Sequence, residues 1–509
     1  MTDTQNHTKL RPLARLLMLA AAFGCLAAPA LAQDAKPEVG KAAEAAPQYL
    51  PKPASKAMSI RIGAKTLNYT ATVGALPIKD DKGKIQAEIV YTAYTLDGAD
   101  KTRRPVTFAF NGGPGAASVY LHLGVMGPKR IPFGNDGEAP SDPALLSDNP
   151  ETWLEFTDLV FIDPVGTGFS RSYVSLEETK RQFWGPQQDI VYLSRIVADW
   201  LLKNERMAAP KFIAGESYGG YRTPRLANQL QSVEGVGISG LVIISPLLDR
   251  ATLSDNEISP VTAVSRLPSM AAAHLERTGK GPVTKAMLAE AEAYARGEYM
   301  VDLMRGPKDA AAKVRLASKV SALTGLDPKL VAQLNGRIDL STYTRELYRD
   351  QQRIASRYDT AVTSFDPYPN SFNRRAGDPT LDVIVAPTTS AAVDFMTRQL
   401  GWKAEGPYYA LSGIVGRNWV YGPAEQIEAV SDLRKVIALD SDMQVLVAHG
   451  FTDTQTPYFA SELILDQIPV MGDPNRVRLT VYPGGHMYYS RDDSRRAFLA
   501  DVKKVYGVR

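Results

Sequence analysis

A serine between two glycines follows a short apolar stretch near the middle of the chain. Lys211-Phe212-Ile213-Ala214 precedes Gly215-Glu216-Ser217-Tyr218-Gly219, and a helical pattern runs from about 221 to 230. A serine on a tight strand-to-helix turn lies close to neighbouring backbone, so both flanking positions must be small. The N-terminus of the next helix would favour negative charge developing on an oxygen. Ser217 is therefore a candidate nucleophile; the alternative is a chance motif in a surface loop.

A nucleophilic serine needs a base, and the chain offers five histidines: His7, His122, His274, His449 and His486. We favour His486, because Pro483-Gly484-Gly485-His486 follows a strand pattern at 477–482, and a rigid edge of this kind suits a catalytic group. His449 is the alternative base. His122 follows a glycine turn and is a candidate for lining the cleft, whereas His274 is predicted on a helix surface.

A carboxylate that orients the base is predicted at Asp453. The apolar run 443–448 is typical of a buried parallel strand, and Asp453 is the first carboxylate after its end. A carboxylate that accepts the Nδ1 hydrogen fixes the histidine tautomer and stabilises the imidazolium. The order serine, acid, histidine is that of α/β-hydrolases. The alternative role for Asp453 is to cap the next helix.

A glycine-rich loop, Asn111-Gly112-Gly113-Pro114-Gly115, follows the apolar strand pattern 106–110. α/β-hydrolases use a loop at this place to supply an oxyanion N–H. A phosphate loop is disfavoured, since neither Gly-Lys-Ser/Thr nor Gly-x-Gly-x-x-Gly occurs there.

Taken together, these motifs resemble the serine carboxypeptidases. The matching blocks are Asn-Gly-Gly-Pro-Gly at 111–115, Asp-Pro-Val-Gly-Thr-Gly-Phe-Ser at 163–170, Gly-Glu-Ser-Tyr-Gly-Gly at 215–220, Gly-x-x-Asp at 450–453 and Gly-Gly-His-Met at 484–487. The resemblance covers roughly residues 65–250 and 440–500.

The resemblance implies a role for each matching residue. Ser217, Asp453 and His486 would form the catalytic triad, and the backbone N–H groups of Gly113 and Tyr218 the oxyanion hole. Asn111 and Glu216 would bind the C-terminal carboxylate of a peptide, with Glu216 protonated, because two carboxylates share a hydrogen bond only if one carries a proton.

The chain also departs from the family pattern. Eukaryotic members usually carry a second carboxylate about fourteen residues after the asparagine, where this chain has Val125. Ala109 and Ala116 replace a tryptophan and a cysteine, and Met487-Tyr488-Tyr489 replaces Met-Val-Pro. These changes affect carboxylate recognition and leave the triad intact.

The pattern along the chain predicts an α/β-hydrolase fold: a doubly wound, mostly parallel sheet with a largely helical cap insertion. Its parts are a signal peptide (1–32), a disordered linker (33–57), the first part of the core (58–250), the cap (251–435) and the second part of the core (436–509). Within the cap, helical stretches are predicted at 284–304 and 327–357, and no strong buried strand.

Composition and the N-terminus indicate the compartment. Lys9, Arg11 and Arg15 precede an apolar run that ends in Ala30-Leu31-Ala32, so cleavage is predicted before Gln33 and the protein is expected to be periplasmic or secreted. An uncleaved anchor and a lipid on Cys25 are the alternatives. Because Cys25 is the only cysteine, the mature chain would have no thiol chemistry.

These observations predict an exported serine carboxypeptidase that acts on peptides with a free C-terminus. No cofactor or metal is expected, and a formal net charge of +3 does not favour nucleic acid or stable membrane association. The oligomeric state is left open. Two other functions fit the same residues: an esterase, amidase or acyltransferase on this scaffold, or a non-catalytic binding protein.

Overall fold

The computed structural model describes residues 49–508, apart from 135–137, 255–257, 280, 372–373, 375–376 and 424–426. The predicted signal peptide, 1–32, lies outside the described residues, as does the predicted linker up to residue 48. The linker prediction is wrong for its last residues, because strand β1 begins at Ala54 and pairs with β2. Among the described helices, none has both the length and the apolar character to cross a membrane.

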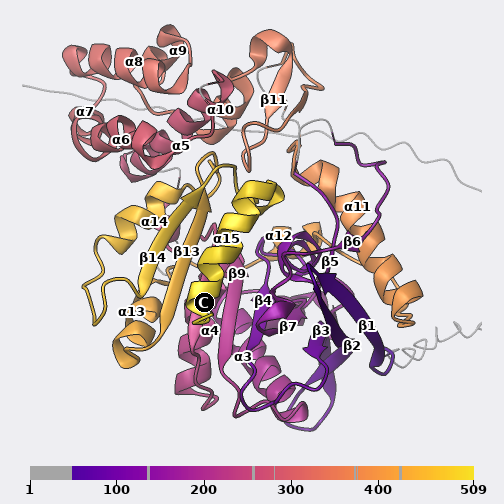
Figure 1. Cartoon of the computed structure of the whole chain (residues 1–509). Coiled ribbons are helices and arrows are strands. Elements are labelled where there is room, and N and C mark those ends of the chain that lie inside the picture. Colours follow the sequence, from indigo (N-terminus) through magenta and orange to yellow (C-terminus); the bar gives the residue numbers. More distant parts are fainter. Residues whose placement is uncertain are drawn as a thin grey trace, which may run out of the picture. The chain divides into compact units, whose positions relative to one another are not determined.

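A ten-stranded mixed sheet forms the centre of the described chain (Figure 1). Its order is β1-β2-β3-β7-β4-β9-β10-β13-β14, with β8 paired to β3. The strands are β1 Ala54–Ile62, β2 Lys65–Lys79, β3 Ile85–Leu96, β4 Val106–Phe110, β7 Asp158–Ile162, β8 Arg171–Ser172, β9 Lys211–Glu216, β10 Gly240–Ile244, β13 Gln444–Gly450 and β14 Val477–Tyr482. β1, β2 and β3 are antiparallel, whereas β7 through β14 along this order are parallel, as predicted.

Both faces of the sheet are covered, because its central strands are apolar on both sides. In β10, Leu241 and Ile243 belong to one buried cluster, and Val242 and Ile244 belong to the other. Helices that pack on the sheet carry apolar residues of one cluster or the other. These helices are α3 Pro186–Lys203, α4 Tyr218–Ser232, α11 Leu381–Asp394, α13 Val430–Leu439 and α15 Asp492–Val505. The predicted doubly wound architecture is thereby confirmed.

A helical insertion lies between β10 and β13 (Figure 1), and its apolar side chains form a third cluster together with Phe451, Tyr458 and Phe459. Its helices are α5 Val261–Arg277, α6 Lys285–Tyr294, α7 Met300–Arg305, α8 Ala310–Thr324, α9 Pro328–Gln333 and α10 Leu340–Glu346. The helical prediction for 284–304 is confirmed, with a π-turn at 295–299. The helical stretch predicted over 327–357 holds for α9 and α10 but not for its end. Positive φ angles at Asn335, Gly336 and Gln352 interrupt it, and Arg353–Ala355 forms strand β11, which pairs with β12, Thr363–Phe365.

The packing divides the predicted cap, 251–435, into two parts. Residues 261–355 contribute to the core of the insertion. In contrast, α11 joins the apolar cluster on one face of the sheet and α13 the cluster on the other face. The pattern of an amphipathic helix does not reveal which surface covers its apolar side. The sequence therefore places α11 and α13 in the cap, whereas the structure packs both helices on the sheet.

A buried ion pair fastens α4 to α3. Arg222 on α4 donates to Asp189 on α3 over 2.6 Å, and neither side chain is exposed to solvent. A second guanidinium nitrogen of Arg222 donates to the carbonyl of Asn111 over 2.6 Å. The helix that follows Ser217 is therefore tied both to its neighbour and to the glycine-rich loop.

We predict that Arg222→Met lowers the free energy of unfolding by about 3–5 kcal/mol, because it leaves Asp189 charged, buried and unpaired. Chemical denaturation followed by circular dichroism measures the loss. The control is Lys101→Met, which breaks the exposed Lys101–Glu205 pair, with side chains 59% and 79% exposed, and should cost less than about 1 kcal/mol. Equal losses in the two variants would contradict the prediction.

Candidate active site

Every predicted site residue lies at or just after the carboxyl end of a parallel strand. Asn111 and Gly113 follow β4, Glu216 ends β9, and Ser217 and Tyr218 come next. The two remaining residues, Asp453 and His486, follow β13 and β14. Because β4, β9, β10, β13 and β14 are neighbours in this order, one edge of the sheet collects residues that are up to 375 positions apart in sequence.

Ser217 occupies a tight turn between β9 and α4. Its φ of 61° and ψ of −119° lie outside the usual regions for an L-residue. A Cβ on Gly215 would stand 2.1 Å from the carbonyl oxygen of Gly219, and one on Gly219 would stand 2.2 Å from that of Phe110. The requirement for small residues on both sides of Ser217 is confirmed, and the turn holds the serine at the N-terminus of α4.

The glycine-rich loop passes directly beside this turn. A Cβ on Gly112 would lie 2.5 Å from the backbone nitrogen of Tyr218 and 2.8 Å from the Cβ of Ser217. The loop therefore approaches the serine as closely as backbone can. Its position is compatible with an oxyanion hole built from the N–H groups of Gly113 and Tyr218, which stays a prediction.

A buried aspartate supports the segment after the glycine-rich loop. Asp163, in the block 163–170, accepts a hydrogen bond from the Ser118 amide over 2.8 Å. The Ser118 hydroxyl donates to the Ile162 carbonyl and also lies 3.4 Å from the Asn111 amide nitrogen. Burial raises the pKa of the Asp163 carboxyl to about 7, although the Ser118 bond opposes the rise. The block 163–170 thus supports the glycine-rich loop through Ser118.

Asn111 and Glu216 are brought together beside Ser217. The side-chain nitrogen of Asn111, Nδ2, donates to Glu216 Oε2 over 2.6 Å, and the side-chain oxygen, Oδ1, accepts from the Leu121 backbone amide over 2.8 Å. The Tyr489 hydroxyl donates to the same Glu216 oxygen over 2.9 Å. Burial raises the pKa of Glu216, partly offset by the charge of His486 and by these two hydrogen bonds. A buried carboxyl next to Ser217 is thus biased toward its protonated form.

Asp453 and His486 form a buried pair at the ends of two adjacent strands, β13 and β14. His486 Nδ1 lies 2.7 Å from Asp453 Oδ2. Burial lowers the pKa of His486, but the charge and hydrogen bond of Asp453 outweigh it, and the net shift is upward. The other carboxylate oxygen accepts from the amides of Gln455 and Thr456, both over 2.9 Å. The following helix, α14 (Tyr458–Leu465), has Pro457 as its N-cap, so Asp453 does not serve as that cap.

Two residues that the sequence analysis missed complete the surroundings of the histidine. The Thr456 hydroxyl donates to the Ser245 carbonyl over 2.9 Å and lies within 3.0 Å of both Asp453 Oδ2 and His486 Nδ1. Ser245, which follows β10, donates its hydroxyl to the His486 carbonyl over 2.8 Å. Ser245 directly follows the apolar run 241–244, and a polar residue at the end of such a run is a signal that the sequence offers. Thr456 carries no comparable signal.

The alternative histidines lie in other surroundings. His449 is buried with Nε2 2.8 Å from the Ser461 hydroxyl, and burial, helped by the charge of His486, lowers its pKa to about 3. His122 lies in the apolar core, 2.6 Å from the Tyr94 hydroxyl and stacked on Phe161, and burial lowers its pKa to about 3. The prediction that His122 lines the cleft is therefore wrong.

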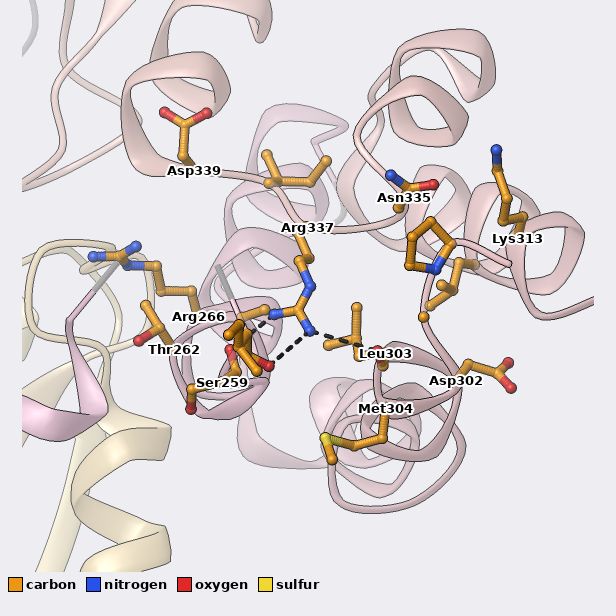
Figure 2. Close-up of a pocket in the computed structure, with 16 residues that line it drawn as sticks. Ser259, Thr262, Arg266, Asp302, Leu303, Met304, Lys313, Asn335, Arg337 and Asp339 are labelled. Atoms are coloured by element: carbon orange, nitrogen blue, oxygen red, sulfur yellow. Dashed lines mark hydrogen bonds between the residues drawn. The ribbon is translucent and has the colours of Figure 1, made fainter. Parts of the chain in front are cut away.

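A cavity of about 660 Å³ lies within the insertion, away from these residues (Figure 2). Its described lining residues come from 258–339 and include none of the predicted site residues. Arg337 reaches across it and donates to the carbonyls of Ser259 and Leu303 over 2.8 and 3.5 Å (Figure 2). Among the described residues, no cluster of histidine, cysteine, aspartate or glutamate is arranged to hold a metal ion.

The sheet order and the serine turn define an α/β-hydrolase fold. Within that class, the chain matches the model of the serine carboxypeptidase family over residues 88–487 and belongs to this family. The resemblance read from the motifs is confirmed.

Relatives agree with the family, and one solved structure agrees with the fold. Pheromone-processing carboxypeptidase KEX1 of Yarrowia lipolytica is 34% identical over 152 residues, which is 30% of this chain and 23% of that relative. Serine carboxypeptidase-like 44 of Arabidopsis thaliana is 30% identical over 158 residues, 28% of this chain and 30% of the relative. These matches span less than a third of the relatives' length. The structure of Kex1(delta)p, a prohormone-processing carboxypeptidase from Saccharomyces cerevisiae, has a TM-score of 0.54 at 16% identity and covers 86% of this chain and 91% of its own.

Proposed function

We propose that this protein is a serine carboxypeptidase that removes residues from the free C-terminus of peptides. The observation that carries the proposal is the buried Asn111–Glu216 pair beside Ser217, joined by a 2.6 Å hydrogen bond. A protonated carboxyl at this place can donate to a substrate carboxylate, which would select the last peptide bond of a chain. Membership of the serine carboxypeptidase family supports the same activity.

In this mechanism, His486 takes the proton of the Ser217 hydroxyl as its oxygen attacks the scissile carbonyl carbon. The N–H groups of Gly113 and Tyr218 stabilise the negative charge on the tetrahedral intermediate. His486 then gives its proton to the leaving amine, and an acyl-serine ester remains. Water, deprotonated by His486, attacks the ester, so that the shortened peptide leaves and the Ser217 hydroxyl is restored.

The buried Asp453 carboxylate supports the role of His486 as a base. Its hydrogen bond holds the ring in the tautomer that leaves Nε2 free to accept a proton, and its charge stabilises the imidazolium that forms. Hydrogen bonds from the backbone amides of Gln455 and Thr456 and from the imidazole occupy both carboxylate oxygens, so Asp453 is itself fixed in place.

Hydrolysis of small esters or amides is a second candidate function, favoured by one observation. Val125, where eukaryotic relatives place a second carboxylate, is only 1% exposed and packs in the apolar core. A substrate carboxylate would then be recognised by Glu216 as the titrating acid, together with its neutral partners Asn111 and Tyr489, and without a second carboxylate at position 125.

We also propose that the protein is exported, with cleavage before Gln33, on the basis of the charged, apolar and small-residue pattern at 9–32. N-terminal sequencing of the protein purified from outside the cytoplasm should then begin at Gln33. A chain that still carries Met1, or a lipid on Cys25, would show that the N-terminal segment is not a cleaved leader.

We predict that Ser217→Ala removes turnover while the fold is retained. Members of a catalytic triad act as a unit, so the loss in kcat should be on the order of 10⁴-fold or more. Release of free amino acids from a peptide library, followed by mass spectrometry, measures activity, and circular dichroism checks the fold. Substantial turnover by a folded Ser217→Ala protein would end the assignment of Ser217 as nucleophile.

We predict that the KM for free-carboxylate peptides rises with pH and that Glu216→Gln weakens this rise. Below its raised pKa, the Glu216 carboxyl is neutral and can donate to the substrate; above it, the ionised group repels the substrate carboxylate. Peptide amides serve as the matched substrates, and their KM should change little with pH or with the substitution. Equal effects on both substrate types would assign Glu216 to bracing the turn and would favour the esterase or amidase alternative.

A further inference from the structure

A short segment of the insertion, Ser356–Asp359, reaches the two loops that carry Asp453 and His486. It lies between β11 and β12. It contacts the acid loop, 452–454, which follows β13, and the histidine loop, 483–486, which follows β14. A part of the chain that the sequence assigns to the cap therefore belongs to the immediate surroundings of the candidate base.

The carboxylate of Asp359 joins both loops. Its Oδ1 accepts from the Thr452 hydroxyl over 3.0 Å, and its Oδ2 accepts from the Gly485 amide over 3.1 Å. The same Oδ2 receives the guanidinium of Arg491 over 2.9 Å, and Arg491 also binds Glu276 on α5 over 2.6 Å. One carboxylate thus connects the residue before the acid, the residue before the histidine, and the residue that leads into α15.

Backbone contacts from the same segment point at the same two loops. The His486 amide donates to the Tyr358 carbonyl over 2.5 Å, and the Thr454 amide donates to the Arg357 carbonyl over 3.2 Å. A Cβ on Gly485 would stand 2.0 Å from the Tyr358 carbonyl oxygen, so the histidine loop lies against this backbone without a gap. The Tyr358 ring lies edge-on to the His486 imidazole, with centroids 5.2 Å apart.

The segment is itself held rigid from the insertion side. Asp378 accepts from the Ser356 hydroxyl over 2.7 Å and from the Arg357 amide over 3.0 Å. In turn, the Ser356 oxygen accepts from the amides of Tyr358 and Asp359 over 3.0 and 3.3 Å. Asp359 is therefore a fixed point rather than a side chain at the end of a mobile loop.

The position of β14 explains why such a support is needed. Among the strands that the structure describes, β14 is the last of the sheet and has a neighbouring strand, β13, on one side alone. The histidine loop continues from this edge strand, so the sheet steadies it from one side. The Ser356–Asp359 segment supplies the hydrogen bonds on the histidine loop that a further strand would otherwise provide.

We propose that Asp359 is a positioning residue that holds the His486 imidazole against Asp453, so that the insertion takes part in building the catalytic base. This inference rests on the proposed serine-hydrolase chemistry of Ser217. Asp359 touches neither Asp453 nor the His486 ring through its carboxylate; it acts through Thr452 and Gly485. The charges that act on His486 come from Asp453, Glu216 and Asp378, and those beside Asp359 are Arg491 and Glu276.

The test is the rate at which a fluorophosphonate modifies Ser217 in the full chain, measured from pH 4 to 9. Because the reaction needs an activated serine but no peptide, it reports on His486 whatever the natural substrate. Asp359→Ala should lower the second-order rate constant about 10²-fold, as a base displaced by about 1 Å would. The acidic midpoint of the profile should move to lower pH, because His486 loses contact with the carboxylate that raises its pKa.

Two further variants make the result specific. Asp359→Asn keeps the size of the side chain and one accepting oxygen, so it should restore part of the rate. Glu276→Gln removes the other carboxylate that pairs with Arg491, and Glu276 itself makes no hydrogen bond to either loop. This variant should keep the rate constant within about twofold of the parent and leave the midpoint pH unchanged. Rates are expressed per labelled site, with the labelled fraction counted by mass spectrometry.

A parental rate and midpoint in folded Asp359→Ala would overturn the proposal, even if its melting temperature fell, because a purely structural residue changes the folded fraction and not the rate per site. If Asp359→Ala does not fold, parental behaviour of Asp359→Asn overturns it in the same way. Failure of the unmodified protein to react with the fluorophosphonate is a different result, which would reject the proposed function itself.

Discussion

The close approach of two backbone segments at Ser217 is the constraint on which the site depends. Gly215 and Gly219 leave no room for a side chain, and Gly112 in the adjacent loop lies against the Tyr218 nitrogen. This contact is made possible by the adjacency of β4 and β9, and the parallel strands β10, β13 and β14 continue the same order and end on the same side of the sheet. The unusual φ of Ser217 is tolerated because the surrounding sheet and α4 determine it.

Around this turn, burial raises the pKa of the carboxyl group of Glu216 and lowers the pKa of the His486 imidazole, and the partners of each group decide the net shift. Glu216 is pushed toward its neutral form, because its hydrogen bonds only partly offset the loss of hydration. His486 is held toward its charged form, because Asp453 outweighs the same loss. His449, one loop away, lacks such a carboxylate and is held neutral. A neutral carboxyl and an imidazole whose charged form is stabilised can therefore lie within one buried cluster.

Much of this arrangement could be predicted from sequence, since glycine turns after apolar strands mark sites at a sheet edge. This pattern predicts Ser217, Asp453 and His486 as the candidate catalytic residues. The sequence could not show the contacts of Asp359, because its partners Thr452 and Gly485 are 93 and 126 residues away and no local pattern records them. The break at Asn335-Gly336 has a local signal, because an Asn-Gly pair marks a turn, whereas the positive φ of Gln352 has no such signal and is imposed by the surrounding packing.

The hydrogen bonds of the Ser356–Asp359 segment limit how the insertion can be exchanged between relatives. Insertions above an α/β sheet are commonly regarded as interchangeable modules that tune specificity while the sheet retains the chemistry. In this chain, a graft that replaced everything between β10 and β13 would also remove the segment bonded to the histidine loop. Chimeras between relatives should therefore keep residues 356–359 and their brace at Asp378 with the recipient sheet, and place the junctions inside the helical part of the insertion.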